Sequence, residues 1–177
     1  MMDIDIDIAA SICSNYDLVM MSGNHGDPIY HPQLPELVAA IRARQPSITF
    51  EIVTNGSFRS ERWWMQLAPL LTKRDSITFS IDGLPYNNHL YRVNSRWPTV
   101  EAGIRTLRAA NPEVRMCWKW IIFSHNQDDI PAGIDMARSL GFNELLCIWS
   151  TRYEQQHQSL IPTKTFEQIR DSVNAAS

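Results

Sequence analysis

The strongest constraint on the fold is an alternation between short, apolar, β-branched runs and longer segments of helical period, which repeats from Asp17 almost to the end of the chain. Runs of the first kind predict strands, and apolar residues spaced three and four apart predict amphipathic helices. The predicted strands are DLVMMS (17–22), ITFEIVT (48–54), SITFSID (76–82), VRMCWKWIIF (114–123) and ELLCIWS (144–150), and the predicted helices cover 35–44, 60–74, 98–110, 129–141 and 165–176.

Residues suited to helix ends support these boundaries. Ser60 and Asp129 can serve as N-caps, and Gly141 can serve as a C-cap. Thr165 and Gln168 have the spacing of a capping box. Pro35 and Pro98 suit the first turns of the other two helices, so each predicted helix has a local start or stop signal in addition to its periodicity.

Strands that are separated by single helices run parallel and have right-handed connections. The pattern predicts an α/β fold with about five parallel strands and flanking helices, either an open doubly wound sheet or part of a (β/α) barrel. Periodicity alone leaves both architectures open. A chain of 177 residues without a low-complexity linker predicts a single domain over residues 1–177.

Composition narrows the class of protein. The formal charge of −3, with scattered Lys and Arg, argues against nucleic-acid or anionic-lipid binding driven by charge. No apolar run has the length of a transmembrane helix, and the acidic start lacks the basic region of a signal peptide. A cytoplasmic protein is therefore expected. Cys13, Cys117 and Cys147 are far apart in sequence and predict reduced, mostly buried thiols.

Polar residues gather after every predicted strand. In both candidate architectures ligands bind beyond the carboxyl ends of the strands, so these loops predict a binding site. Turns need polar residues in any case, and that alternative explains each loop taken singly. It explains less well why Ser80 lies within an apolar strand. The loops are Ser22–Pro28, Thr54–Ser57, Ser80–Gly83, Ser124–Asn126 and Ser150–Arg152.

Other side chains give weaker signals. The five histidines show no helical ligand spacing, so no metal site is predicted from them. Five tryptophans lie in strand or helix patterns, which favours packing over base stacking. The segment TRYEQQHQ (151–158) is consistent with the mouth of a substrate site and with a plain connection. The tryptophans are Trp63, Trp64, Trp118, Trp120 and Trp149.

Four motifs in this order resemble those of the radical S-adenosylmethionine (SAM) superfamily. HGDP (25–28) is similar to the Gly-Gly-Glu-Pro motif that follows the second strand of that family's partial barrel, with histidine and aspartate as departures. VTNGS (53–57) and FSIDGL (79–84) resemble the motifs after its third and fourth strands, and Tyr91-Arg92 resembles a Tyr-Arg pair before the next helix. The resemblance covers roughly residues 17–149 and is closest to a little-characterised phage and marine-microbial branch.

The resemblance implies a SAM site. Gly26 would allow close approach of the backbone to the methionine end of SAM, Pro28 would stiffen the turn, and Asp27 would brace the loop. Arg92 would pair with the methionine carboxylate, for which a guanidinium fork is well shaped. The remaining implied cofactor-binding residues are Thr54, Asn55, Ser80, Asp82 and Asn126.

The cluster motif of that family is missing. Radical SAM enzymes hold a [4Fe-4S] cluster with three cysteines, usually spaced CxxxCxxC, and this sequence has no such motif. The family's first strand and cluster loop are therefore expected to precede Met1, with residues 1–16 as a remnant of the first helix or a frayed terminus. The open edge of the first strand would then invite self-association.

The functional expectation is a radical SAM-type enzyme domain that is inactive as this chain alone. The alternative is a non-catalytic SAM- or nucleotide-binding module. An unrelated barrel enzyme is disfavoured, because no convincing Schiff-base lysine or late Gly-rich phosphate loop is present. The substrate stays undefined, because substrate contacts in the family lie in variable loops, and no catalytic residue is assigned.

Overall fold

The fold is a single parallel sheet whose five strands lie side by side in chain order, β1-β2-β3-β4-β5. The computed structural model describes residues 5–23, 26–150 and 158–176. The sequence-based prediction of an α/β fold with about five parallel strands is confirmed. The strands are β1 (Leu18–Met21), β2 (Thr49–Thr54), β3 (Ser76–Ser80), β4 (Arg115–Ile121) and β5 (Glu144–Ile148).

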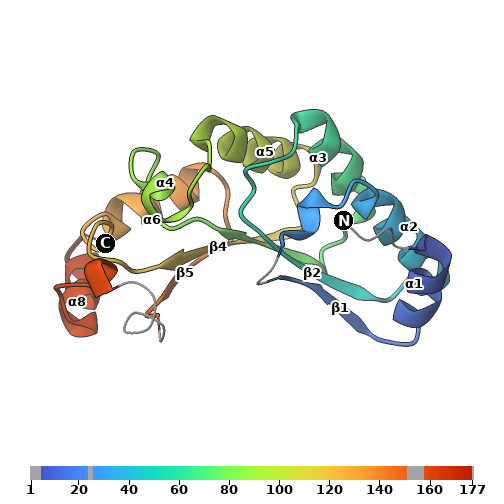
Figure 1. Ribbon diagram of the computed structural model, residues 1–177, viewed down its shortest axis with the longest axis horizontal. Helices are drawn as coiled ribbons and strands as arrows, with labels where there is room; N and C mark the ends of the chain where they lie inside the picture. Colours follow the sequence, from blue (N-terminus) through green and yellow to red (C-terminus); the bar gives the residue numbers. More distant parts are fainter. Residues whose placement is uncertain (1–4, 24–25, 151–157, 177) are drawn as a thin grey trace.

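The helices cover one side of the sheet. Figure 1 shows the sheet as an arch, with most helices over its convex side and with α1 and α8 at opposite ends of the molecule. The concave side carries no comparable helical layer among the described residues, which is the arrangement of a partial barrel. The helices are α1 (Ile6–Cys13), α2 (Leu34–Arg44), α3 (Glu61–Leu67), α4 (Asn88–Tyr91), α5 (Trp97–Ala110), α6 (Ile130–Ser139) and α8 (Phe166–Ala176), with 3-10 turns η1 (Pro28–Tyr30), η2 (Ala68–Leu70) and η3 (Gln158–Leu160).

Two predicted segments differ from the structure. The helix predicted over 60–74 ends at Leu67 and continues only as the turn η2. Pro69 lies in that turn, and a proline cannot donate the backbone hydrogen bond that would continue the helix. No helix or strand was predicted between the strand 76–82 and the helix 98–110, where the structure has the short helix α4. The capping box is present, since Thr165 and Gln168 exchange backbone-to-side-chain bonds at 2.9 and 3.3 Å.

An aromatic core joins the sheet to the helices. The rings of Trp118 and Trp120 stack with centroids 5.6 Å apart, and both side chains are fully buried. A Cβ atom at Gly133 would lie 2.5 Å from Trp120, so only glycine lets α6 approach this ring so closely. Packing is therefore the role of these tryptophans. Trp149 differs, because 38% of it is exposed.

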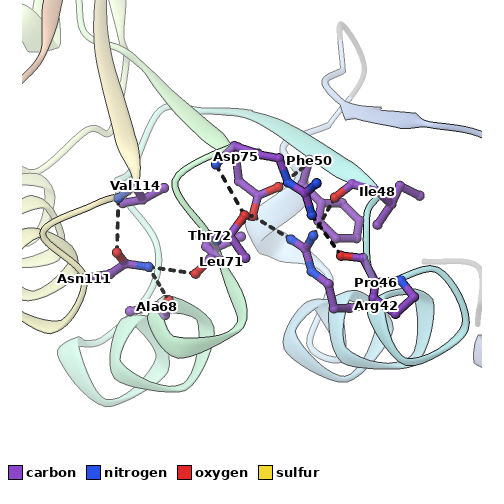
Figure 2. A network of polar contacts seen from close by, with 11 residues as sticks. Arg42, Pro46, Ile48, Phe50, Ala68, Leu71, Thr72, Asp75, Asn111 and Val114 are labelled. Carbon is purple, nitrogen blue, oxygen red and sulfur yellow. Dashed lines mark hydrogen bonds and ion pairs between the residues drawn. The ribbon is translucent and has the colours of Figure 1, made fainter.

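A hydrogen-bonded network closes the amino end of the sheet (Figure 2). The fully buried carboxylate of Asp75 accepts bonds from the Phe50 amide, the Thr72 amide and hydroxyl, and the Arg42 guanidinium at 2.5–3.0 Å. Beside it, the Asn111 side chain donates to the Ala68 and Leu71 carbonyls, at the two ends of η2, and accepts from the Val114 amide. This end of the sheet is tied together by internal polar contacts.

Among the described residues, no helix is both long and apolar enough to cross a membrane.

Candidate functional site

The loop after β1 is tied to the loop after β2 by one carboxylate. Asp27 caps the turn η1, where its Oδ1 accepts a bond from the Ile29 amide at 3.1 Å. Its Oδ2 accepts a bond from the Asn55 amide at 2.6 Å, 28 positions along the chain. Asp27 therefore braces two neighbouring loops at the carboxyl end of the sheet.

The loop after β2 folds back on its own side chains. The Thr54 hydroxyl accepts a bond from the Gly56 amide at 3.0 Å, and the Asn55 Oδ1 accepts bonds from the amide and hydroxyl of Ser57 at 2.9 and 2.6 Å. Gly56 has a φ of +70°, a left-handed conformation that favours glycine. This explains the Thr-Asn-Gly-Ser sequence locally and leaves the loop with a fixed shape.

An ion pair links the end of β3 to the segment after α4. The Arg92 Nε donates to Asp82 Oδ2 at 2.5 Å, and the Ile121 amide donates to the other Asp82 oxygen at 2.6 Å. Burial raises the pKa of the Asp82 carboxyl, and the neighbouring Arg92 guanidinium offsets part of that rise. The pair holds Arg92 by one nitrogen. Among the described residues, no hydrogen bond engages its two terminal nitrogens.

These loops enclose a pocket of about 260 Å³. Its lining takes polar groups from the ends of β1, β2 and β3 and from Arg92, whose side chain is 27% exposed. A Cβ atom placed on Gly26 would meet no described atom within 4 Å, so that position opens into free space. Of the nine predicted binding residues, the lining includes Gly26, Asp27, Thr54, Asn55, Ser80 and Arg92.

A second hollow of about 420 Å³ adjoins the first, and the two share Tyr30, Asn55 and Arg92. Its walls include Phe58 and Tyr91. Tyr30 meets the Phe58 ring edge-on at 4.6 Å. The polar pocket thus adjoins a second hollow whose walls include aromatic side chains.

Three predicted site residues do not line the pocket. Pro28 begins the turn η1, where its fixed φ suits a first helical position. Asp82 is fully buried and faces Arg92 and the Ile121 amide. Asn126 is also fully buried, and its side chain bonds the Asp82 and Ile121 carbonyls and the Phe123 amide. These side chains stabilise the loops that form the pocket and do not line it.

Sequence reasoning missed Tyr30 and Val53, which also line the pocket, and it placed Gly23 in a binding loop without assigning it a role. Tyr30 lies only two residues after the HGDP motif, and this proximity was the available signal. Val53 alternates with the buried Ile52 and Thr54, so strand periodicity could have placed it on the concave face. Part of the predicted loop, Asn24 and His25, and most of the segment 151–158 lie outside the described residues.

The cysteines do not form a metal site. Within residues 5–23, 26–150 and 158–176, no three His, Cys, Asp or Glu side chains are grouped to hold a metal ion. Cys117 is buried, and Cys13 and Cys147 are half-buried, all with free thiols. Burial raises the pKa of Cys147 to about 11 and also raises the pKa of Cys117. Since the thiolate is the metal ligand, Cys117 and Cys147 are poorly suited to bind iron.

The fold, one sheet of five parallel strands with flanking helices, matches the partial barrels of solved radical SAM structures. Among solved structures, the chain matches Streptococcus suis SuiB bound to S-adenosylmethionine with a TM-score of 0.68 and 12% identity, over 96% of this chain and 39% of SuiB. It matches native anSMEcpe with bound AdoMet with a TM-score of 0.66 and 14% identity, over 95% of this chain and 48% of that protein.

A third match is the coproporphyrinogen III oxidase HemN from Escherichia coli, a radical SAM enzyme, with a TM-score of 0.66 and 11% identity. It covers 96% of this chain and 42% of HemN. The chain thus spans less than half the length of each of these three proteins, and at such low identity the matches establish the fold. No protein-family model and no curated protein matched the sequence.

Proposed function

We propose that this chain is a radical SAM-type domain that binds SAM in the pocket at the carboxyl ends of β1, β2 and β3. The observation that carries the proposal is the coincidence of a radical SAM fold with a polar pocket formed by the motif residues. The matched structures of SuiB and anSMEcpe contain SAM, and the resemblance in sequence concerns the same loops.

The residues of the pocket fit the methionine end of SAM. That end carries a carboxylate and an ammonium group, and the terminal nitrogens of Arg92 can donate to the carboxylate as a fork. The open space at Gly26 leaves room for the ligand against the backbone. Ser80 and Thr54 contribute hydroxyl groups at the pocket wall, where they can bond to polar groups of the ligand.

The supporting contacts orient these groups before a ligand arrives. Asp82 fixes the guanidinium of Arg92 through Nε, which leaves the other two nitrogens for the pocket. Asp27 holds the Asn55 amide and thereby fixes the distance between the first two loops. Binding then requires little reordering of the protein, which favours affinity.

The described residues do not fit the [4Fe-4S] cluster of the family. The three cysteines are separated on α1, β4 and β5, and they form no ligand group. In radical SAM enzymes the cluster supplies the electron that cleaves SAM to a 5′-deoxyadenosyl radical. We therefore expect the chain alone to bind SAM without cleaving it.

The described residues contain no group of side chains that could hold a metal cluster, and this favours one alternative function. In this alternative the chain is a non-catalytic module that binds SAM or a nucleotide. Both functions use the same pocket. They differ in whether an iron–sulfur cluster is present beside the bound ligand. Product formation separates them when the domain is supplied with the cluster-bearing segment of the family.

Isothermal titration calorimetry of the purified chain with SAM tests the pocket. We expect saturable 1:1 binding that Arg92→Gln weakens about 10- to 100-fold, the range for a charged hydrogen bond. Arg105→Gln is the matched control, because Glu101 on the same helix α5 is the sole partner of Arg105 among the described residues. Absence of SAM binding, or equal affinity in both variants, would contradict the proposal.

Anaerobic reconstitution with iron and sulfide tests the cluster separately. We expect no stable iron–sulfur absorbance and no 5′-deoxyadenosine from this chain with SAM and a reductant. A stable cluster spectrum would overturn the expectation that the chain lacks the ligands. Binding of ATP with SAM-like affinity would favour the nucleotide-binding alternative.

A further inference from the structure

The second hollow, beside the proposed SAM pocket, has no role in the function proposed above. Its volume is about 420 Å³, which lies within the range of small-ligand sites. Its walls come from the turn η1, the loop after β2 and the segment after α4. None of its lining residues belongs to the edge strands β1 and β5. Three loops that are separated in sequence thus form this hollow.

Apolar side chains in this hollow remain open to solvent. Val93 is 75% exposed, Phe58 is 55% exposed and Tyr30 is 37% exposed. Single exposed apolar side chains are normal on protein surfaces, whereas several around one hollow mark a binding site. The Tyr30 and Phe58 rings meet edge-on at 4.6 Å, which holds them in a defined relative orientation. The hollow therefore favours a ligand that brings an apolar group to these walls.

The same hollow contains uncharged polar groups that can bond to a ligand. The Tyr30 hydroxyl and the Asn94 side-chain amide bond to no described residue. The Ser95 Oγ accepts a bond from the Asn88 side chain at 3.1 Å, so its own hydrogen is left to donate. These groups match a neutral hydroxyl or amide on the ligand.

The charges of the hollow exclude a cationic ligand. Its described lining contains no Asp or Glu, so an ammonium group placed there would lack a counter-charge. Arg92 is the charged group of the lining, and it faces both hollows. Its guanidinium carbon lies 5.3 Å from the centroid of the Tyr91 ring. A guanidinium that already packs on one aromatic ring can attract a second one.

We propose that the second hollow binds the aromatic ring of the substrate, an uncharged ring that carries a hydroxyl group. An aromatic ring is favoured over an aliphatic group because ring-to-ring and cation–π contacts add to the gain from burial. The role as a substrate site rests on the proposed SAM function. The two hollows share Tyr30, Asn55 and Arg92, so the ring would lie next to bound SAM.

Titration with p-cresol, followed by amide NMR spectra of the full chain, tests the chemistry of the hollow. We expect saturable shift changes at Phe58, Val93 and Asn94. Methylcyclohexanol, the saturated counterpart, should bind about 2- to 10-fold more weakly, the range that aromatic contacts contribute. Methylbenzylamine, a cation, should also bind more weakly than p-cresol. Equal affinities for the phenol and the saturated alcohol, or shift changes confined to other parts of the chain, would overturn the proposal.

A pair of variants tests the location. Val93→Glu should weaken p-cresol binding at least about 10-fold, because the bound ring would remove water from the new carboxylate. Leu90→Glu is the matched control, since Leu90 is 53% exposed on α4 and does not line the hollow. Circular dichroism establishes that both variants are folded. Equal p-cresol affinity in the two variants would contradict the assignment to this hollow.

The source of the ring is tested with N-acetyl-L-tyrosinamide, which carries the same phenol on a peptide-like frame. Binding tighter than that of p-cresol assigns the ring to an amino acid or a peptide, and equal or weaker binding assigns it to a free phenol. Both results support the aromatic site.

Titration with p-cresol in the presence of saturating SAM separates this proposal from the SAM function. We expect p-cresol to bind with the same or higher affinity, because the two ligands occupy adjoining hollows. Displacement of p-cresol by SAM would show that SAM fills both hollows and would overturn the substrate assignment. If SAM binds and p-cresol does not, this inference alone fails. If p-cresol binds in the hollow and SAM does not bind, the proposed SAM function fails and the ring site stands.

Discussion

Two buried aspartates bracket β3, and their surroundings differ. Asp75 precedes the strand and accepts four hydrogen bonds, including one from Arg42 (Figure 2). Asp82 follows the strand and accepts two, one from the Ile121 amide and one from Arg92. Both carboxylates are fully buried and each is paired with an arginine. Only the second pair reaches the pocket.

The difference lies in what each arginine does with its remaining nitrogens. Arg42 also donates to the Ile48 carbonyl, so it is used within the protein. Arg92 lines the pocket, and no described residue bonds to its terminal nitrogens. At the amino end of a parallel sheet such a pair serves stability, whereas at the carboxyl end it can also serve a ligand. This contrast predicts separable effects of mutation.

Asp75→Asn should give the largest loss of stability. An amide group cannot accept all four hydrogen bonds, and Arg42 would lose its buried counter-charge. Breaking a buried pair from one side costs about 3–5 kcal/mol in the free energy of unfolding. Urea unfolding followed by tryptophan fluorescence measures it. Asp135→Asn, in an exposed pair with Arg138, is the control and should change stability by less than about 0.5 kcal/mol.

The contrast is wrong if Asp75→Asn alters SAM affinity as strongly as stability. Under conditions in which the variant remains folded, its affinity for SAM should equal that of the wild type, because the Asp75 network contributes no residue to the pocket.

Asp82→Asn should cost less stability, about 1–2 kcal/mol, because only two donors lose part of their acceptor. The effect should depend on pH. Burial raises the Asp82 pKa above its ordinary value of 3.8, so the stabilisation by this carboxyl is greatest below pH 3.8. It decreases as pH rises through the raised pKa. The difference in free energy of unfolding between the wild type and Asp82→Asn should therefore become smaller as pH rises from 3.5 to 7. Urea unfolding of both proteins at several pH values measures it.

SAM affinity is the second measurement on Asp82→Asn. We expect a decrease of about 10-fold at neutral pH, since Arg92 loses the charged partner that fixes its orientation. Unchanged affinity would show that Asp82 acts only on the fold, as Asp75 does, and would remove the distinction between the two ends.

The sequence predicted the sheet well because strand and helix periods are local properties of the chain. It predicted the site less completely. Asp82 and Asn126 were expected in the pocket, yet both satisfy backbone amides at the end of β4. A polar side chain after a strand can face a ligand or the backbone of the neighbouring strand, and only the packed structure decides which. Tyr30 was missed although it lies only two residues after the HGDP motif.

Gly26→Ala tests whether the ligand lies against the loop after β1. The added methyl group would project into open space, so stability should change by less than about 0.5 kcal/mol. If SAM approaches the backbone at this point, the methyl group should weaken binding about 10-fold. Calorimetry with SAM measures it. Gly103→Ala is not a suitable control, since its Cβ would lie 2.5 Å from the Trp64 ring. Unchanged SAM affinity in Gly26→Ala would move the ligand away from the β1 loop.

Substitution of His125 should have the smallest effect on stability. It tests whether the carboxyl end of the sheet contains buried polar groups without hydrogen-bond partners. Both of its ring nitrogens are buried and unpartnered among the described residues, and the ring stacks on Phe123 at 5.5 Å. Burial lowers the His125 pKa below its ordinary value of 6.5, and the nearby Asp129 carboxylate offsets part of that shift.

A histidine whose pKa is lowered by folding stabilises the folded state above pH 6.5, and this contribution is lost as pH falls through the lowered pKa. His125→Phe removes the titrating group and keeps a ring against Phe123. The wild type should therefore lose stability relative to this variant between pH 7.5 and 5, by less than about 1 kcal/mol. Thermal unfolding at several pH values measures it, with His89→Phe on the short helix α4 as the control. A difference between wild type and His125→Phe that does not vary with pH would show that the imidazole is solvated in the folded protein, and that its nitrogens are not buried without partners.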